Sequence, residues 1–245
     1  MSNFVHFTFH QDFNVFLDKV NRNQTYTYFF EENSTVKDSI EVQGIPHTEV
    51  EWVLVNKQSV NFSYRLQNED NVEVFPYHAK LQMPCIVRPP VSNLDFMVDF
   101  NVRKLTKYLR MLGFRTVTDE GVPDEEIAAI AERENKIVLT RDIGLLKRKN
   151  VTYGYFLRSE DVEKQIVEVI KRYELLPKIS PFSICLTCNG GIQHVAKENI
   201  LEELPILIQE EYEEFFQCNA CQKVYWKGSH FDNMRKVIDS LQEQN

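Results

Sequence analysis

Two pairs of cysteines restrict most strongly what this chain can fold into. Cys185 and Cys188 form one CxxC pair, Cys218 and Cys221 form another, and 29 residues separate the pairs. Thiolates on paired turns suit the tetrahedral shell of Zn²⁺, and four protein ligands leave no open coordination position, which is typical of a structural site. The interval is longer than in the simplest sites of this type, so we expect residues 201–209 to loop out between the pairs. Disulfide bonds are the alternative for the same residues.

The rest of the sequence has the composition of a folded, soluble protein. Hydrophobic residues make up 43% of the 245 residues and charged residues 26%, so most of the chain can bury a core. The apolar runs are too short to cross a bilayer. The N-terminus lacks the basic start and apolar stretch of a secretory signal, so we expect a cytoplasmic protein with no membrane partner. In that reducing setting, cysteines are expected to bind metal or stay free.

Two proline-rich stretches divide the chain into three segments. Prolines interrupt helices and strand ladders, and they gather at residues 84–90 and 177–181. We therefore expect three domains, which cover residues 1–83, residues 94–178, and residues 181–245 with the cysteine pairs and a C-terminal helix.

The first segment has the strand and helix order of a β-grasp fold. Thr35, with Asp38 three residues later, predicts a helix start, and Gly44 predicts the helix end. Alternating apolar and β-branched residues predict strands on both sides of this helix. The expected strands cover residues 4–10, 26–30, 50–56 and 72–75, and the expected helix covers residues 36–42.

Three stretches of this segment, residues 36–41, 44–50 and 70–76, resemble a ubiquitin-like domain related to the sulfur carriers of the ThiS and MoaD type. True carriers end in a Gly-Gly tail, whereas here the chain continues past the last strand. Sulfur transfer is therefore not expected, and the domain is a candidate for contact with a protein partner. His47 is expected to be a hydrogen-bonded turn residue without a catalytic role.

The middle segment alternates strands with helices, which indicates a parallel sheet covered by helices. The expected strands cover residues 95–99, 115–117, 136–140 and 152–157, and the expected helices cover residues 101–112, 124–135, 143–149 and 161–173. In open sheets of this kind, ligands bind outside the carboxyl ends of the strands.

Three aspartates stand at such positions. Asp99 and Asp142 follow the first and third expected strands, and Asp124 opens a helix. Right-handed crossovers would bring the three strand ends to one edge of the sheet. Neighbouring carboxylates raise one another's pKa, so such a group favours a hard cation, Mg²⁺ or Mn²⁺, which suits hydrolysis of a phosphodiester. The alternative for each aspartate is a helix N-cap.

Basic residues of the middle segment are candidates for binding phosphate. The chain has a net charge of −8, yet residues 86–180 hold 17 Lys and Arg against 15 Asp and Glu. On the helix expected at residues 101–112, Arg103, Lys107 and Arg110 share one face, opposite an apolar face. A charged, solvated helix surface is the alternative.

Four stretches of the middle segment, residues 96–99, 105–114, 124–127 and 137–146, resemble the Mut-seven C-terminal RNase domain. The resemblance covers about residues 94–233, and the family also shows a ubiquitin-like domain in front of the nuclease. It implies a PIN-like α/β fold with a zinc ribbon, and RNA as substrate. Asp99, Asp124 and Asp142 would form its metal-dependent site, with Arg110 and Arg141 as phosphate partners. Glu125 or Asp161 would supply any fourth carboxylate.

Two hypotheses on function follow from this combination. The first is a metal-dependent ribonuclease that hydrolyses RNA through the three aspartates. The alternative is a non-catalytic adaptor that binds RNA or protein through the zinc ribbon and the ubiquitin-like domain. Tyr225, Trp226 and Phe231, which follow the second cysteine pair, could stack on unpaired bases or pack the ribbon.

Overall fold

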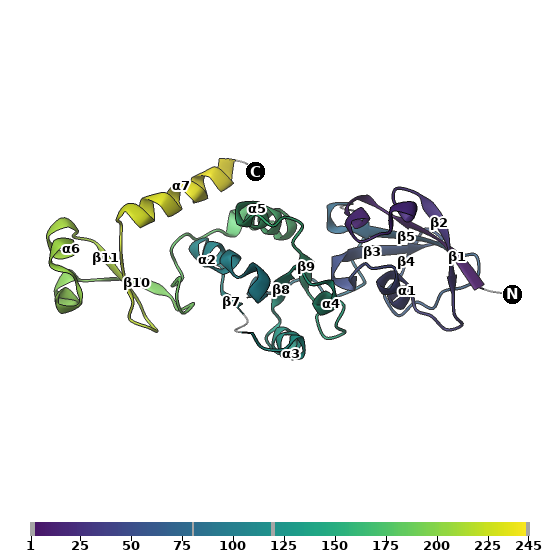
Figure 1. Ribbon diagram of the computed structural model, residues 1–245, viewed down its shortest axis with the longest axis horizontal. Coiled ribbons are helices and arrows are strands. Elements are labelled where there is room, and N and C mark those ends of the chain that lie inside the picture. The colour runs from purple at the N-terminus through teal and green to yellow at the C-terminus, as the bar shows by residue number, and fades with distance from the viewer. Residues whose placement is uncertain (1–2, 80, 119–120, 244–245) are drawn as a thin grey trace. The chain divides into compact units, whose positions relative to one another are not determined.

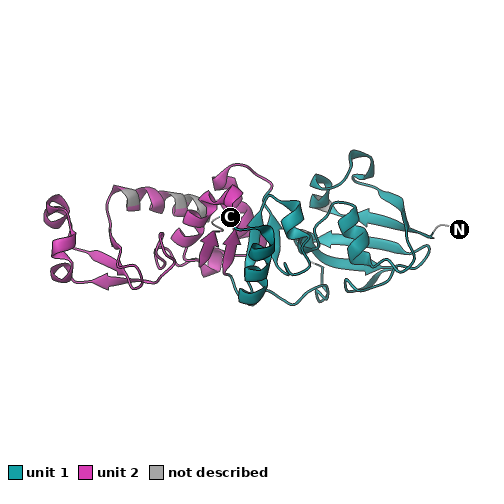
Figure 2. Cartoon of the chain, turned by 60° about the horizontal axis from the view of Figure 1, so that its bottom comes forward, with its two compact units in different colours: residues 1–94, 121–157 teal, residues 95–120, 158–245 magenta. Residues whose placement is uncertain are grey.

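The computed structural model describes residues 3–79, 81–118 and 121–243 (Figure 1). The chain divides into two compact units, shown in Figure 2. Unit 1 comprises Met1–Leu94 and Gly121–Leu157, and unit 2 comprises Asp95–Glu120 and Arg158–Asn245. The middle segment thus contributes to both units, and the three domain boundaries given above stay a prediction. In the described part of the chain, no helix is both long and apolar enough to cross a membrane.

Unit 1 contains the mixed sheet expected for a ubiquitin-like fold. Its strands are β1 (Asn3–Phe9), β2 (Thr25–Phe30), β3 (Val50–Val55), β4 (Gln58–Ser59) and β5 (Asn71–Pro76). They lie in the order β2-β1-β5-β3-β4, with β1 parallel to β5 and the other pairs antiparallel. The helix α1 (Val36–Val42) connects β2 to β3. The predicted β-grasp arrangement is therefore confirmed.

Local sequence signals account for the bounds of α1. The Thr35 hydroxyl oxygen accepts a hydrogen bond from the Asp38 N–H at 3.2 Å, which is the predicted helix cap. Gly44 has a φ of +102°, and a Cβ there would lie 2.7 Å from the Phe16 carbonyl oxygen, so this turn requires glycine. Ile40 of α1 is fully buried together with Phe7 of β1, which places the core between helix and sheet.

The remainder of unit 1 is a strand and helix segment. It consists of α3 (Asp124–Glu134), β8 (Ile137–Thr140), α4 (Ile143–Leu146) and β9 (Gly154–Phe156). The strands β8 and β9 pair in parallel, and every residue of β8 is buried. A continuous apolar run of this kind is typical of a parallel strand covered on both faces.

Unit 2 begins with the other strands of the middle segment. It contains β6 (Phe96–Val98), α2 (Lys104–Met111), β7 (Thr116–Thr118) and α5 (Val162–Tyr173), with β6 parallel to β7. Parallel strands followed by helices are therefore confirmed for both parts of this segment. The helix expected at residues 101–112 begins as a short 3₁₀-helix, Phe100–Val102, before α2 starts. Its apolar face is buried as expected, through Val102, Leu105, Leu109 and Leu112.

The C-terminal part of unit 2 is a small antiparallel sheet followed by a long helix. The sheet has the order β10-β11-β12, formed by β10 (Ile192–Val195), β11 (Phe215–Cys218) and β12 (Val224–Trp226). The helix α6 (Ile206–Glu211) lies between β10 and β11, within the insertion expected between the cysteine pairs. The chain then forms α7 (Ser229–Glu243).

Candidate functional site

The four cysteines of the two CxxC pairs come together in unit 2. Their sulfur atoms all lie within 4.8 Å of one another. Cys188 Sγ lies 3.3 Å from Cys218 Sγ, and Cys185 Sγ lies 3.7 Å from Cys221 Sγ. All four are free thiols, so the disulfide alternative does not apply. The predicted grouping of these residues is confirmed.

Each cysteine pair sits on a tight turn that directs backbone N–H groups at sulfur. The Thr187 N–H donates to Cys185 Sγ at 3.4 Å, and the Ala220 N–H donates to Cys218 Sγ at the same distance. These bonds stabilise a thiolate on each turn. A Cβ on Gly190 would lie 2.8 Å from Cys218 Sγ, so the close approach of the two turns depends on this glycine.

Cys185 and Cys221 differ in their pKa values. Burial raises the pKa of Cys185, but hydrogen bonds from the Tyr225 hydroxyl and from backbone N–H groups lower it to about 6. The Lys223 N–H lowers the pKa of Cys221, but hydrogen bonds with the neighbouring sulfurs, Cys188 first, raise it to about 12. Four adjacent thiolates repel one another unless a cation neutralises them. The group is therefore consistent with a structural Zn²⁺ site that has four sulfur ligands.

Arg110, a predicted phosphate partner, connects α2 to the first cysteine turn. Its Nη1 atom donates to the carbonyl oxygens of Leu186 and Thr187 at 3.0 and 2.9 Å. Its Nε and Nη2 atoms donate to the Thr116 carbonyl oxygen at 2.9 and 2.6 Å. Most of the N–H groups of this guanidinium thus hold protein carbonyls, and contact of Arg110 with phosphate stays a prediction.

The other two basic residues on this side of α2 are exposed, as expected for the face opposite the buried leucines. Arg103 places its guanidinium 4.2 Å from the centre of the Phe100 ring. Lys107 lies one helical turn after Arg103, at i+4. These two cations are open to solvent, and their binding of phosphate also stays a prediction.

Asp99, in unit 2, directly follows the carboxyl end of β6. Its Oδ1 atom accepts a hydrogen bond from the Asn101 N–H at 3.2 Å and so caps the 3₁₀-helix Phe100–Val102. Only 7% of Asp99 is exposed. The capping alternative is confirmed for this residue, but capping does not prevent a carboxylate from also binding a metal ion.

Asp142, in unit 1, follows the carboxyl end of β8 and caps α4. Its Oδ1 atom accepts hydrogen bonds from the Gly144 and Leu145 N–H groups at 2.6 and 3.2 Å. Asp142 is exposed, and its Oδ2 atom has no hydrogen-bond partner among the residues that the structure describes. One oxygen of this carboxylate is therefore used by the helix and the other is open to a ligand.

Asp124, also in unit 1, is the first residue of α3 and does not cap it, because the N-cap position is Pro123. Its Oδ2 atom lies 3.8 Å from Arg148 Nη2, and the same Nη2 atom donates to Glu125 Oε1 at 2.8 Å. Two hydrogen bonds lower the pKa of Glu125. The larger effect comes from a backbone N–H and the smaller from Arg148. Asp161, the other candidate for a fourth carboxylate, caps α5 in unit 2.

Arg141, the remaining predicted phosphate partner, lies between β8 and Asp142. Its Nη1 atom donates to the Leu157 carbonyl oxygen at 3.0 Å, and its guanidinium lies 5.9 Å from the centre of the Phe156 ring. Arg141 thus bridges the ends of β8 and β9. A role in phosphate binding stays a prediction, as does the convergence of the three aspartates.

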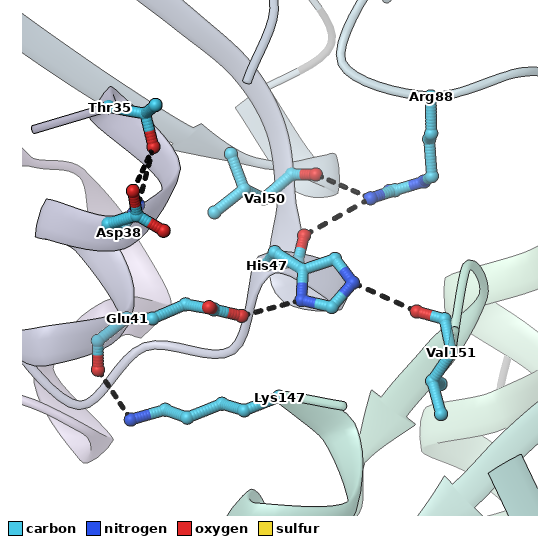
Figure 3. A network of polar contacts seen from close by, with 8 residues as sticks. All are labelled: Thr35, Asp38, Glu41, His47, Val50, Arg88, Lys147 and Val151. Atoms are coloured by element: carbon cyan, nitrogen blue, oxygen red, sulfur yellow. Dashed lines mark hydrogen bonds and ion pairs between the residues drawn. The ribbon is translucent and has the colours of Figure 1, made fainter. Parts of the chain in front are cut away.

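Unit 1 contains a buried polar network that no local sequence pattern indicates (Figure 3). The His47 ring lies between the Glu41 carboxylate, at 2.7 Å from Nδ1, and the Val151 carbonyl oxygen, at 2.9 Å from Nε2. Lys147 Nζ donates to the Glu41 carbonyl oxygen at 2.5 Å. Arg88 Nη1 donates to the His47 and Val50 carbonyl oxygens at 3.4 and 2.7 Å. His47 is hydrogen-bonded as expected, but its partners join distant parts of the sequence.

A second contact of the same kind involves Glu49. This residue is 5% exposed, and its Oε1 atom accepts a hydrogen bond from the Phe156 N–H at 2.6 Å, at the carboxyl end of β9. The 3₁₀ turn His47–Glu49, directly before β3, therefore holds both the turn after α4 and the end of β9. Since α4 begins directly after Asp142, this 3₁₀ turn supports the segment that carries that aspartate.

Comparison with known proteins identifies two family models along the chain. A model described as the Mut7-C RNAse domain matches residues 94–238, and a model described as Mut7-C ubiquitin matches residues 2–82. No curated protein and no solved structure matches the chain. The two matches follow one another in the order expected from the resemblances noted in the sequence.

Proposed function

Since the chain belongs to the Mut7-C RNAse domain family and carries the Mut7-C ubiquitin domain in front, we propose that it is a metal-dependent ribonuclease. Asp99, Asp124 and Asp142 would hold the catalytic Mg²⁺ or Mn²⁺ ion. The observation that carries this assignment is the state of Asp142, which follows a parallel strand and keeps one carboxylate oxygen open to a ligand. Ligands of parallel sheets bind at this end of the strands.

The donor set suits such an ion. Mg²⁺ and Mn²⁺ prefer carboxylate oxygens, and Mg²⁺ usually takes one or two of them together with water and phosphate. When bound, the ion would lower the pKa of an attacking water and offset charge on the leaving oxygen. The exposed Arg103 and Lys107 would bind the RNA backbone, and Arg141 would orient the end of β8 next to Asp142. The four cysteines would hold Zn²⁺ in a structural role.

A cleavage assay on labelled RNA tests this proposal. We expect cleavage with added Mn²⁺ and a loss of at least about a hundredfold in Asp142→Asn, similar to the loss when one group that stabilises transition-state charge is removed from a catalytic site. Asparagine caps helices as well as aspartate does, so this variant keeps the support for α4. Asp38→Asn, at another helix start in unit 1, is the matched control and should cleave normally. Full activity of Asp142→Asn would refute the assignment of this residue.

The same assay tests the alternative hypothesis, a non-catalytic adaptor. A protein that is folded and loaded with zinc, yet cleaves no RNA with either Mg²⁺ or Mn²⁺, would show that the family fold here serves binding alone. Metal should be withheld rather than chelated in the negative control, because a chelator would also remove zinc from the cysteines.

A further inference from the structure

Unit 2 contains a large groove that is lined by Lys107 but by none of the three proposed metal-binding aspartates. The groove has a volume of about 840 Å³ and is lined by residues of α2, the first cysteine turn, α6, β12 and the start of α7. Figure 1 labels α2, α6 and α7. This volume falls within the range of small-molecule pockets. It is large enough for one or two nucleobases with their sugars. Its size alone does not identify an occupant.

Aromatic side chains form much of the groove wall. They are Tyr108, Tyr212, Tyr225, Trp226 and Phe231. Each is partly exposed, so part of the side chain is packed and part is accessible. The Phe231 ring packs on Phe182 at 4.5 Å between centres, and Trp226 packs on the small core of the ribbon. These residues therefore pack within unit 2, as the alternative predicted, and also present an accessible ring surface. The buried part of each side chain fixes the position of the ring.

The charged side chains that line the groove are both positive. The described residues that line it include Lys107 and Lys223 but no aspartate or glutamate, although the whole chain has a net charge of −8. Lys223 Nζ donates to the Thr187 hydroxyl at 3.1 Å, on the same turn whose carbonyl oxygen accepts from Arg110. Lys107 precedes Arg110 by three residues on α2 and lines the same groove as Leu186 of this turn.

Carboxylates lie near two tyrosines of the groove wall. Burial raises the pKa of Tyr108 and Tyr212; Glu163 and Asp161 add to this effect on Tyr108, and Glu211 and Asp232 add to it on Tyr212. A polyanion in the groove would therefore place its phosphates toward Lys107 and Lys223 and its bases toward the aromatic wall. This division between stacking surfaces and cations is typical of sites for single-stranded nucleic acid.

We propose that the groove binds a single-stranded segment of the RNA substrate, with unpaired bases stacked on the aromatic wall and backbone phosphates on Lys107 and Lys223. The inference rests on the proposed ribonuclease function for its choice of RNA. Bases in a duplex are already stacked on one another, so the groove would discriminate against double-stranded RNA.

Binding measurements on the full chain test this assignment without cleavage. Fluorescence anisotropy would use an oligouridylate of about 12 nucleotides, within the size range of single-strand sites, and the same strand in a blunt duplex. The protein keeps its zinc, and no Mg²⁺ or Mn²⁺ is added. We expect the single strand to bind at least tenfold more tightly than the duplex.

Two variants address the two walls of the groove. The double variant Lys107→Gln/Lys223→Gln should weaken binding at least tenfold and lower the slope of log affinity against log salt by about 1.4, from two lost phosphate contacts on a single strand. Tyr108→Leu, which keeps an apolar side chain, should weaken binding about fivefold or more through lost stacking. The matched controls Lys197→Gln and Phe216→Leu lie in unit 2 outside the groove lining and should bind as the unmodified protein does.

The outcomes separate this proposal from the ribonuclease proposal. Unchanged binding in both groove variants, equal binding of duplex and single strand, or no binding of either RNA would overturn the groove assignment. If the single strand binds and the groove variants weaken it, but no metal supports cleavage, the groove stands and the catalytic proposal falls.

Discussion

Replacing His47 by leucine tests whether the buried network of unit 1 stabilises the fold. Leucine keeps an apolar side chain in the space but removes both hydrogen bonds, to Glu41 and to the Val151 carbonyl oxygen. The side chains of His47 and Glu41 are 7% and 19% exposed, so water replaces these bonds poorly. A bond to a charged partner contributes about 1.5–3 kcal/mol and a neutral one about 1 kcal/mol, so we expect a loss of about 3 kcal/mol in the free energy of unfolding.

The tryptophans of the chain allow this loss to be measured in unit 1 alone. The sequence contains two tryptophans, of which Trp52 lies in unit 1 and Trp226 in unit 2. In a Trp226→Phe background, the fluorescence of the 8% exposed Trp52 reports urea unfolding of unit 1. Hydrogen exchange of residues 143–156 provides a second readout, because the network holds the turn after α4.

A second histidine of unit 1 is the matched control. His10 Nε2 lies 3.2 Å from Glu73 Oε2, and the two side chains are 34% and 36% exposed. An ion pair so open to solvent contributes less than about 1 kcal/mol, so His10→Leu should cost little through this contact. If His47→Leu costs no more than His10→Leu, and leaves exchange of residues 143–156 unchanged, the stabilising role of the network is refuted.

Two further predictions concern the cysteine site and its support. Cys188→Ser should abolish stoichiometric zinc binding, measured by elemental analysis, because serine is a poor replacement for a thiolate ligand; full zinc content would argue against a four-sulfur site. Arg110→Gln should increase hydrogen exchange of residues 185–188 at least tenfold, since it removes the bonds to Leu186 and Thr187 and each net bond is worth about 1 kcal/mol. The exposed Arg115→Gln is its control, and equal exchange in both variants would exclude a supporting role for Arg110.

Local signals in the sequence were sufficient for most helices and strands. The hydroxyl of Thr35 caps α1 as the motif predicts, and the apolar face of the helix after Asp99 is buried as its periodicity predicts. The spacing of the CxxC pairs likewise predicted the sulfur cluster, because each pair must form its own turn before the two turns can meet. Three of the four strands expected in the middle segment are shorter than expected, and β7 is shifted by one residue, since short buried strands have no alternating pattern to mark their ends.

The partners of individual polar side chains were decided by the tertiary structure. As a cation on a polar helix face, Arg110 is predicted to bind phosphate. Its guanidinium instead donates hydrogen bonds to carbonyl oxygens 76 and 77 residues away. His47 and Glu49 meet partners 104 and 107 residues away, which no local pattern could indicate. By itself the sequence determined the local elements, the family and the grouping of the four cysteines, because these depend on spacing along the chain. Only the folded chain assigned the long-range hydrogen bonds, because a buried polar group pairs with whichever partner packing brings within about 3 Å.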